Sequence, residues 1–387
     1  MQSVIPARSK LPDVGTTIFT TIGQLSAEHH AVNLAAGSPS FDCDPQLVDY
    51  TAEAMRAGHN QYSAMTGLPA LREALAEKVA RLYGSHYDPA REVTIIASAS
   101  QGLYSAISAL VHPGDEVIYF EPAFDSYAPI TRLQGAVPVP VKISLDDLRI
   151  DWDAVSAAVT SRTRMIIVNS PHNPTGMAFS EEDIRRLTAL TENTDILILS
   201  DEVYEHMVFD GQPHRSMAAY PALAARSVVV SSFGKTYGVT GWRVGYCLAP
   251  AELMWEIRKV HQFMVFAADT PMQYAFATAL ENPDSYLRLP AFYQHKRDLL
   301  TQALASSPFH VMPSAGSFFL LARFRHFSSM SDNDMAVGLI RDAKVSSIPL
   351  SAFYNDGTET GMIRLSFAKD DETLLEGARR LCAWGTV

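Results

Sequence analysis

Short runs of β-branched and aliphatic residues alternate along this chain with longer stretches that have helical periodicity. Such runs are typical of strands that are buried on both faces of a sheet. They predict an α/β fold in which a mostly parallel sheet is covered by helices on both sides. The predicted strands span residues 93–97, 117–120, 165–169, 196–200 and 228–231.

Helices are predicted over residues 101–111, 181–191 and 254–264, between or after these strands. The helix at 181–191 has the clearest start. Ser180 precedes it as an N-cap, and Glu181, Glu182 and Asp183 place negative charge in the first turn, where it favours the helix dipole.

The pattern changes after about Asp284. A long helical stretch continues to Leu304, and apolar runs follow at 317–321 and 362–367. This order predicts a smaller α+β domain. A chain of 387 residues with 47% hydrophobic content exceeds the usual size of one domain, so two domains are expected.

Charge and cysteine content exclude several classes of protein. The formal net charge is -11 and no block of Lys and Arg stands out, which argues against a nucleic-acid surface. No uncharged apolar run approaches the length of a membrane span, and no signal-peptide core is evident. Cys43, Cys247 and Cys382 are far apart, so we expect neither a disulfide framework nor a metal site. A cytoplasmic location is the expectation.

Polar clusters follow three of the predicted strands. They span residues 169–176 (Asn-Ser-Pro-His-Asn-Pro-Thr-Gly), 200–205 (Ser-Asp-Glu-Val-Tyr-Glu) and 231–235 (Ser-Ser-Phe-Gly-Lys), and Arg243 follows the last one. Because the carboxyl ends of parallel strands meet at one edge of a sheet, we expect these clusters to face one crevice. A lysine after a strand is most often a solvated surface charge. Lys235 is a candidate site residue only because the other polar clusters are expected at the same edge of the sheet.

These motifs resemble those of the class I and II aminotransferases, which belong to fold type I and use pyridoxal 5'-phosphate (PLP). The resemblance covers nearly the whole chain. Residues 9–12, 15–19, 62–67 and 171–174 are most similar to bacterial methionine aminotransferases, relatives of the kynurenine aminotransferases. The resemblance implies a mostly parallel seven-stranded sheet, a large PLP-binding domain at 46–284, and a small domain formed by 1–45 and 285–387.

Lys235 is the implied reactive residue. An amino acid Cα–H is a very weak acid, and PLP supplies the electron sink that its removal needs. By resemblance, Lys235 forms a Schiff base (aldimine) with PLP and moves a proton between Cα and the cofactor. The alternative is the lysine of a nucleotide-binding loop. Residue 229, five before Gly234, is Val, so that glycine-rich motif is absent.

Three residues are expected around the cofactor ring. The resemblance places Asp201 at the pyridine nitrogen, where an ion pair keeps the ring protonated, and Tyr204 and Asn173 at the phenolic oxygen. Asp201 could instead cap a helix, and Asn173 could be a turn residue before Pro174. Lys235, Asp201 and Tyr204 are the predicted catalytic residues.

The phosphate is expected at the start of the helix that follows residues 93–97. Small residues there, Ala99 and Ser100, with Gln101, would leave backbone N–H groups facing an anion. Such residues also cap helices for purely structural reasons. By resemblance, Ser232 and Arg243 complete the phosphate site.

Two aromatic residues match the family pattern. Phe124 matches the ring that stacks on the pyridine, and this role is favoured over the alternative of a core phenylalanine. Tyr62 matches a tyrosine that reaches the phosphate of the neighbouring subunit. The resemblance therefore implies a homodimer with shared active sites.

The substrate is expected to be an amino acid held by its carboxylate. By resemblance, Arg364 is the carboxylate clamp, Gly37 and Asn173 contribute to the same place, and Ile18 and Phe19 line the pocket. In an alternating strand, Arg364 could equally point outward into solvent.

The donor is expected to be uncharged. Residues 265–271 contain no cation that could bind a second carboxylate, and Asp269 would repel one. Methionine is favoured, with aromatic amino acids next, and a 2-oxo acid is the acceptor in a ping-pong reaction. The alternative is a kynurenine aminotransferase or cysteine-S-conjugate β-lyase. Kynurenine-type relatives carry a Phe-His pair where this chain has Ala268 and Asp269, which weakens that alternative.

Overall fold

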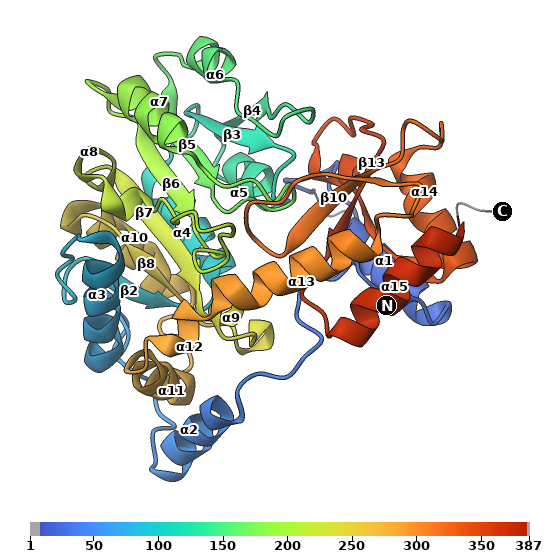
Figure 1. Ribbon diagram of the computed structural model, residues 1–387. Helices are drawn as coiled ribbons and strands as arrows, with labels where there is room; N and C mark the ends of the chain where they lie inside the picture. Colours follow the sequence, from blue (N-terminus) through green and yellow to red (C-terminus); the bar gives the residue numbers. More distant parts are fainter. Residues whose placement is uncertain (1–7, 385–387) are drawn as a thin grey trace.

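A seven-stranded sheet forms the centre of the protein (Figure 1). The computed structural model describes residues 8–384, so the ends of the predicted small domain, residues 1–7 and 385–387, lie outside the described residues. The strand order is β2-β8-β7-β6-β5-β3-β4. The strands are β2 (Val93–Ile96), β3 (Glu116–Glu121), β4 (Val137–Lys142), β5 (Thr163–Asn169), β6 (Leu197–Asp201), β7 (Ser227–Ser232) and β8 (Gly245–Leu248).

The predicted α/β fold with a mostly parallel sheet is confirmed. Only β8 runs antiparallel to its two neighbours, β2 and β7. All five predicted strands are present, within one or two residues at most ends. The prediction missed β4 and β8. In β4, prolines at 138 and 140 interrupt the run, which is tolerated because β4 lies at the sheet edge.

Helices cover both faces of this sheet. One face packs against α4 (Ala99–Leu110), α5 (Tyr127–Leu133) and α10 (Ala251–Met264). The other packs against α3 (Pro69–Tyr83), α6 (Trp152–Ala158), α7 (Glu181–Thr191) and α11 (Thr270–Leu280). Along β5, Met165 and Ile167 face the first group, whereas Ile166 and Val168 face the second. Both faces are therefore buried, as the apolar runs predicted.

The helices predicted at 101–111, 181–191 and 254–264 are all present, as α4, α7 and α10, and α10 begins three residues earlier than predicted. The helix predicted at 181–191 is α7, and Ser180 and Asp183 form a reciprocal capping box at its start. The long stretch after Asp284 divides into α12 (Asp284–Leu287) and α13 (Leu289–Ala303). Pro290 lies in the first turn of α13, where its missing N–H costs nothing.

A second, antiparallel sheet packs beside the first, with strand order β12-β13-β10-β9. Its strands are β9 (His310–Val311), β10 (Phe319–Arg323), β12 (Ile348–Pro349) and β13 (Met362–Ser366). The helices α1 (Ile18–Glu28), α14 (Asp332–Gly338) and α15 (Asp371–Trp384) pack around it, and β1 (Val32–Asn33) pairs with β11 (Val345–Ser346). The N-terminal segment thus joins the C-terminal part, while the exact domain boundaries remain a prediction.

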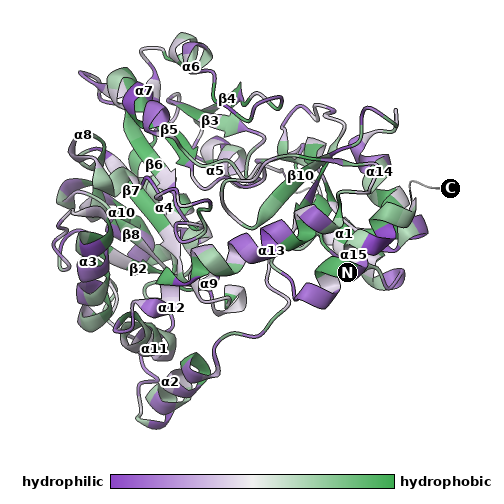
Figure 2. Cartoon of the chain, viewed as in Figure 1, coloured by the Kyte–Doolittle hydropathy of each residue, from purple (hydrophilic) through white to green (hydrophobic). Residues whose placement is uncertain are grey.

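Hydrophobic residues are concentrated in the central strands, whereas helices such as α3, α7 and α13 contain many hydrophilic residues (Figure 2). The remaining helices are short or peripheral: α2 (Pro45–Arg56), α8 (Pro221–Ala224) and α9 (Phe233–Thr236). Among residues 8–384, no helix combines the length and apolar character needed to cross a membrane. The three cysteines are free.

The register of the central strands brings the polar clusters together. In the parallel pairing of β5 with β6, Asn169 lies opposite Asp201, and in the pairing of β6 with β7, Asp201 lies opposite Val230. Lys235 follows in α9, which starts directly after β7. The predicted meeting of the three clusters at one edge of the sheet is confirmed.

Candidate active site

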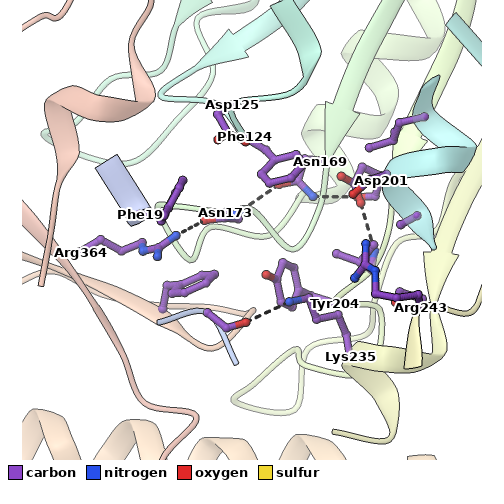
Figure 3. Close-up of a pocket in the computed structure, with 17 residues that line it drawn as sticks. Phe19, Phe124, Asp125, Asn169, Asn173, Asp201, Tyr204, Lys235, Arg243 and Arg364 are labelled. Atoms are coloured by element: carbon purple, nitrogen blue, oxygen red, sulfur yellow. Dashed lines mark hydrogen bonds between the residues drawn. The ribbon is translucent and has the colours of Figure 1, made fainter. Parts of the chain in front are cut away.

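A cavity of about 300 Å³ lies at this edge, between the two sheets (Figure 3). Most of the predicted site residues line it: Phe19, Gly37, Ala99, Ser100, Phe124, Asn173, Asp201, Tyr204, Ser232, Lys235, Arg243 and Arg364. They come from the N-terminal part of the chain, from the C-terminal ends of β2, β3, β5, β6 and β7 or the segments that follow them, and from β13. The fold therefore brings together residues that are far apart in the sequence.

Lys235 points into the cavity from α9. Its Nζ donates a hydrogen bond to the carbonyl oxygen of Gly37 at 3.0 Å and lies 5.6 Å from the centre of the Tyr204 ring. Burial, together with the positive charges of Arg364 and Arg243, lowers the pKa of this amine from 10.5 to about 8, while the negative charge of Asp201 opposes the shift. A substantial fraction of the amine is therefore neutral and nucleophilic near pH 8.

Asp201 ends β6 and is only 4% exposed. Its Oδ2 accepts a hydrogen bond from the hydroxyl of Tyr127 at 2.7 Å, and its Oδ1 accepts a longer one, 3.4 Å, from the backbone N–H of Val203. Burial raises its pKa to about 6, against the opposing effects of Tyr127 and Lys235. The carboxyl is thus mostly ionised at neutral pH. A turn rather than a helix follows it, so the alternative of a helix cap is wrong.

Asn169 and Asn173 connect Asp201 to the far side of the cavity. The Nδ2 of Asn169 donates to the backbone oxygen of Asp201 at 2.8 Å, and its Oδ1 accepts from the backbone N–H of Asn173, also at 2.8 Å. The Oδ1 of Asn173 in turn accepts from Nη1 of Arg364 at 2.7 Å. Figure 3 shows this series of bonds crossing the cavity wall. Asn173 is therefore more than a turn residue.

Arg364 is almost completely buried, at 1% exposure, so the alternative of a surface arginine is wrong. Its guanidinium lies 3.9 Å from the centre of the Phe319 ring, 4.9 Å from Phe353 and 5.6 Å from Phe19. Nη2 donates to the oxygen of Ala35 at 3.0 Å, whereas Nε has no hydrogen-bond partner among the described residues. Burial lowers its pKa to about 9. A buried guanidinium with a spare donor is suited to bind a carboxylate.

The opposite end of the cavity is suited to an anion. Ala99 and Ser100 line it at the N-terminus of α4, where the helix dipole is positive. Arg243 lines the same end and donates from Nη1 to the oxygen of Thr240 at 3.1 Å. Gly245 permits the close approach of the strands and α4, because a Cβ there would lie 2.5 Å from the oxygen of Ser231.

Three predicted residues do not line the cavity. The side chain of Gln101 bonds to Ser105 Oγ and to the Ala97 N–H, behind the first turn of α4. Ile18 starts α1 and packs in the core beside the second sheet. Tyr62 is 84% exposed, with its ring 5.4 Å from that of Phe266.

Five residues that line the cavity were not predicted as site residues: Leu103, Asp125, Asn169, Val203 and Phe319. Asp125 directly follows Phe124 and adds a carboxylate to the cavity; burial raises its pKa, and Arg364 opposes that shift. Asn169 is the last residue of a predicted strand and the first of the polar cluster at 169–176. Its position in the sequence therefore could have indicated a site residue. Leu103, Val203 and Phe319 carry no such signal, because apolar residues are common in every strand and helix.

We expect Lys235 to react with acetic anhydride at half its maximal rate near pH 8, because only the neutral amine is nucleophilic. Exposed lysines, with a pKa of about 10.4, provide the internal reference. The measurement is mass spectrometry of peptides from protein treated with hydroxylamine, which removes any bound aldehyde. A midpoint for Lys235 equal to that of exposed lysines would contradict this electrostatic description.

Comparisons with known proteins agree with this geometry. The chain is 45% identical to methionine aminotransferase of Escherichia coli, over 97% of both chains. It is 34% identical to kynurenine–oxoglutarate transaminase 1 of Mus musculus, over 99% of both. A crystal structure from Escherichia coli, described as having a methionine aminotransferase function, matches with a TM-score of 0.96 at 44% identity, over 98% of this chain and all of that one.

An N-succinyldiaminopimelate aminotransferase structure from Mycobacterium tuberculosis also matches, with a TM-score of 0.94 at 34% identity, over 98% of this chain and all of that one. The model of the family described as aminotransferase class I and II matches residues 29–381. Relatives that share the fold over their whole length therefore share one reaction type. This chain belongs to the class I and II aminotransferases.

Proposed function

We propose that this protein is a PLP-dependent aminotransferase that moves the amino group of an uncharged amino acid, methionine first, to a 2-oxo acid. One observation carries the proposal: a nucleophilic lysine, a buried carboxylate and a buried arginine line the same cavity. When bound, PLP supplies the electron sink that stabilises negative charge at the substrate Cα.

The residues present fit this cofactor. PLP has an aldehyde, a basic ring nitrogen and a phosphate, and the cavity offers a neutral amine, an acid and an anion site. Lys235 would hold the aldehyde carbon, Asp201 the ring nitrogen, and the N-terminus of α4 with Ser232 and Arg243 the phosphate. Phe124 lines the cavity beside Asp201 and would cover one face of the ring.

Lys235 is also the proposed base. Because its lowered pKa leaves much of the amine neutral, Nζ can accept the proton from the substrate Cα. The same nitrogen would then donate that proton to the cofactor. Tyr204 is buried at 3% exposure, and its pKa is raised, chiefly by burial. Its hydroxyl therefore keeps its proton and can donate a hydrogen bond throughout. Asn173 is proposed to donate with it to the phenolic oxygen.

Arg364 is the proposed clamp for the substrate carboxylate. Three aromatic rings and two hydrogen bonds already fix the guanidinium, so little side-chain entropy is lost on binding. Gly37 and Phe19 line the same cavity, whereas Ile18, predicted with them, packs in the core behind it. A carboxylate fixed here orients the Cα–H toward the lysine.

An uncharged donor is favoured by the charges of the cavity. Asp125 lines it, so the second carboxylate of glutamate or aspartate would meet a like charge. The names of the relatives in Escherichia coli support methionine in particular. Asp269 accepts a hydrogen bond from the Met272 N–H as the cap of α11, and Ala268 is buried. The Phe-His pair expected of kynurenine-type enzymes is therefore replaced in this chain.

A homodimer with shared active sites is part of the proposal. Tyr62, Phe263 and Phe266 are large apolar side chains with exposures of 84%, 87% and 45%. Exposed aromatic groups of this kind mark an interaction surface. Tyr62 would then reach the phosphate in the partner subunit. The predicted cytoplasmic location stays a prediction.

The cofactor proposal is tested with Lys235→Ala. We expect loss of the visible absorption of the lysine-bound cofactor and a fall in turnover of about 10²–10⁴-fold, because anchor and base are removed together. Lys259→Ala, at an exposed position, is the control and should match the wild type. Retention of both absorption and turnover in Lys235→Ala would refute the proposal.

Arg364→Ala tests the clamp. We expect the KM for the amino donor to rise about tenfold or more, since charge-assisted hydrogen bonds contribute about 1.5–3 kcal/mol each. Arg149→Ala removes an arginine whose side chain is 83% exposed and should leave KM unchanged. Steady-state kinetics, with circular dichroism to verify folding, provide the measurement. An unchanged KM in a folded Arg364→Ala protein would exclude the clamp.

Donor choice is tested by mixing cofactor-loaded enzyme with single amino acids and following the absorbance change of the half-reaction. Methionine should react faster than glutamate and kynurenine. Asp125→Asn should raise the glutamate kcat/KM about tenfold and alter that of methionine less than about twofold. Asp269→Asn, which keeps a side chain able to cap α11, is the control. It should leave the glutamate kcat/KM unchanged if Asp125 is the residue that repels the second carboxylate. Equal rates for glutamate and methionine in the wild type would contradict the proposed donor class.

A further inference from the structure

Tyr127 lies behind the cavity and is absent from its lining, yet it makes the shorter of the two hydrogen bonds to the Asp201 carboxylate. Its hydroxyl donates to Oδ2 of Asp201 at 2.7 Å, and the two residues are 3% and 4% exposed. Tyr127 is the first residue of α5, and its ring belongs to the apolar cluster between α4, α5, α10 and the sheet. The bond therefore reaches Asp201 from the protein interior, where water does not compete.

Few other groups stabilise the Asp201 carboxylate. Among the described residues, the Val203 N–H is the other donor to it, at 3.4 Å. Lys235 of α9 opposes the burial effect by its charge, whereas Glu202, next in the chain, adds to it, and Tyr204 faces Asp201 from the following turn. Most of the hydrogen-bonding support for a negative charge in this apolar place comes from Tyr127.

The same residue also supports the loop that carries Phe124. The two rings meet edge to face, with centres 5.8 Å apart and planes at 75°. The Oγ1 of Thr131 donates to the backbone carbonyl oxygen of Tyr127 at 2.9 Å within α5. The backbone of Tyr127 is thus fixed within α5, while its side chain contacts both Phe124 and Asp201.

We infer that Tyr127 is a positioning residue of the active site, whose hydroxyl fixes the orientation of the Asp201 carboxylate and keeps it ionised toward the pyridine nitrogen of the cofactor. This inference rests on the proposed function. Tyr127 touches neither cofactor nor substrate and acts through Asp201. Removing the hydroxyl leaves Oδ2 of Asp201 buried without its donor, which increases the affinity of the carboxyl for a proton and weakens its pairing with the ring.

Tyr127→Phe removes this hydroxyl and keeps the ring that packs against Phe124. We expect the dissociation constant of PLP to rise about tenfold or more, the loss typical of one hydrogen bond to a charged group. The acid limb of PLP binding should move to higher pH, because Asp201 then takes up a proton more readily. The kcat should fall, with a donor KM within about twofold of the wild type, since Arg364 is untouched.

Tyr119→Phe is the matched control. Tyr119 lies in β3 within the same apolar cluster, is 2% exposed, and donates to Oε1 of Glu121 at 3.0 Å, away from Asp201. Tyr119→Phe removes the same atom from a buried bond to a carboxylate, and also removes the acceptor of a hydrogen bond from the Asn355 side chain, so it is the more severe loss of the two. We expect its PLP affinity and pH profile to match the wild type, whatever its effect on thermal unfolding. An equal loss of affinity in Tyr119→Phe would show a general packing effect and overturn the inference.

A double-mutant cycle tests whether Tyr127 acts through Asp201. In an Asp201→Asn background, no carboxylate remains to be kept ionised, so adding Tyr127→Phe should change PLP affinity much less than it does in the wild type. An undiminished effect there would overturn the inference, as would wild-type affinity in Tyr127→Phe itself. If the wild-type protein neither binds PLP nor transaminates, the proposed function fails first. If the wild type binds PLP and transaminates but Tyr127→Phe has wild-type affinity, only the role of Tyr127 is refuted.

Discussion

The active site depends on the in-register pairing of β5, β6 and β7. This pairing sets Asn169 beside Asp201 and ends β7 where α9 begins with Lys235 two residues on. Side chains alternate along a strand, so a slip of one residue would turn Asp201 away from the cavity. The apolar side chains of these strands are closely packed on both faces, and their differing shapes oppose such a slip. The core therefore determines the position of the chemistry.

Charges in the cavity differ in sign from those of the whole chain. Lys235, Arg243 and Arg364 provide three cations against the carboxylates of Asp125 and Asp201, an excess of one positive charge, whereas the chain has a net charge of -11. Buried charge is costly unless it is paired. Burial lowers the pKa values of Lys235 and Arg364, and the positive charge of Arg364 lowers that of Lys235 as well, so an anionic ligand would be stabilised in this cavity.

Sequence alone predicted what depends on local pattern. The strands at 165–169, 196–200 and 228–231, and the polar residues after them, follow from composition and from the geometry of parallel sheets. The antiparallel β8 was missed because four residues that begin with glycine carry little strand signal. Tyr127 was missed for another reason. It lies 74 residues from Asp201 in the sequence, and a tyrosine at a helix start predicts nothing about a distant partner.

The segment from the end of β3 to the start of α5 connects the residues around Asp201 with those around Arg364. The Ala123 N–H donates to the oxygen of Phe353 at 2.8 Å, and the Phe353 ring packs on the guanidinium of Arg364. The next residue, Phe124, lines the cavity, and Tyr127, four residues after Ala123, donates a hydrogen bond to Asp201. One short segment therefore contacts the residues proposed to bind the cofactor ring and those around the carboxylate clamp. Because both contacts are short and buried, a displacement of this loop would disturb both ends of the cavity together.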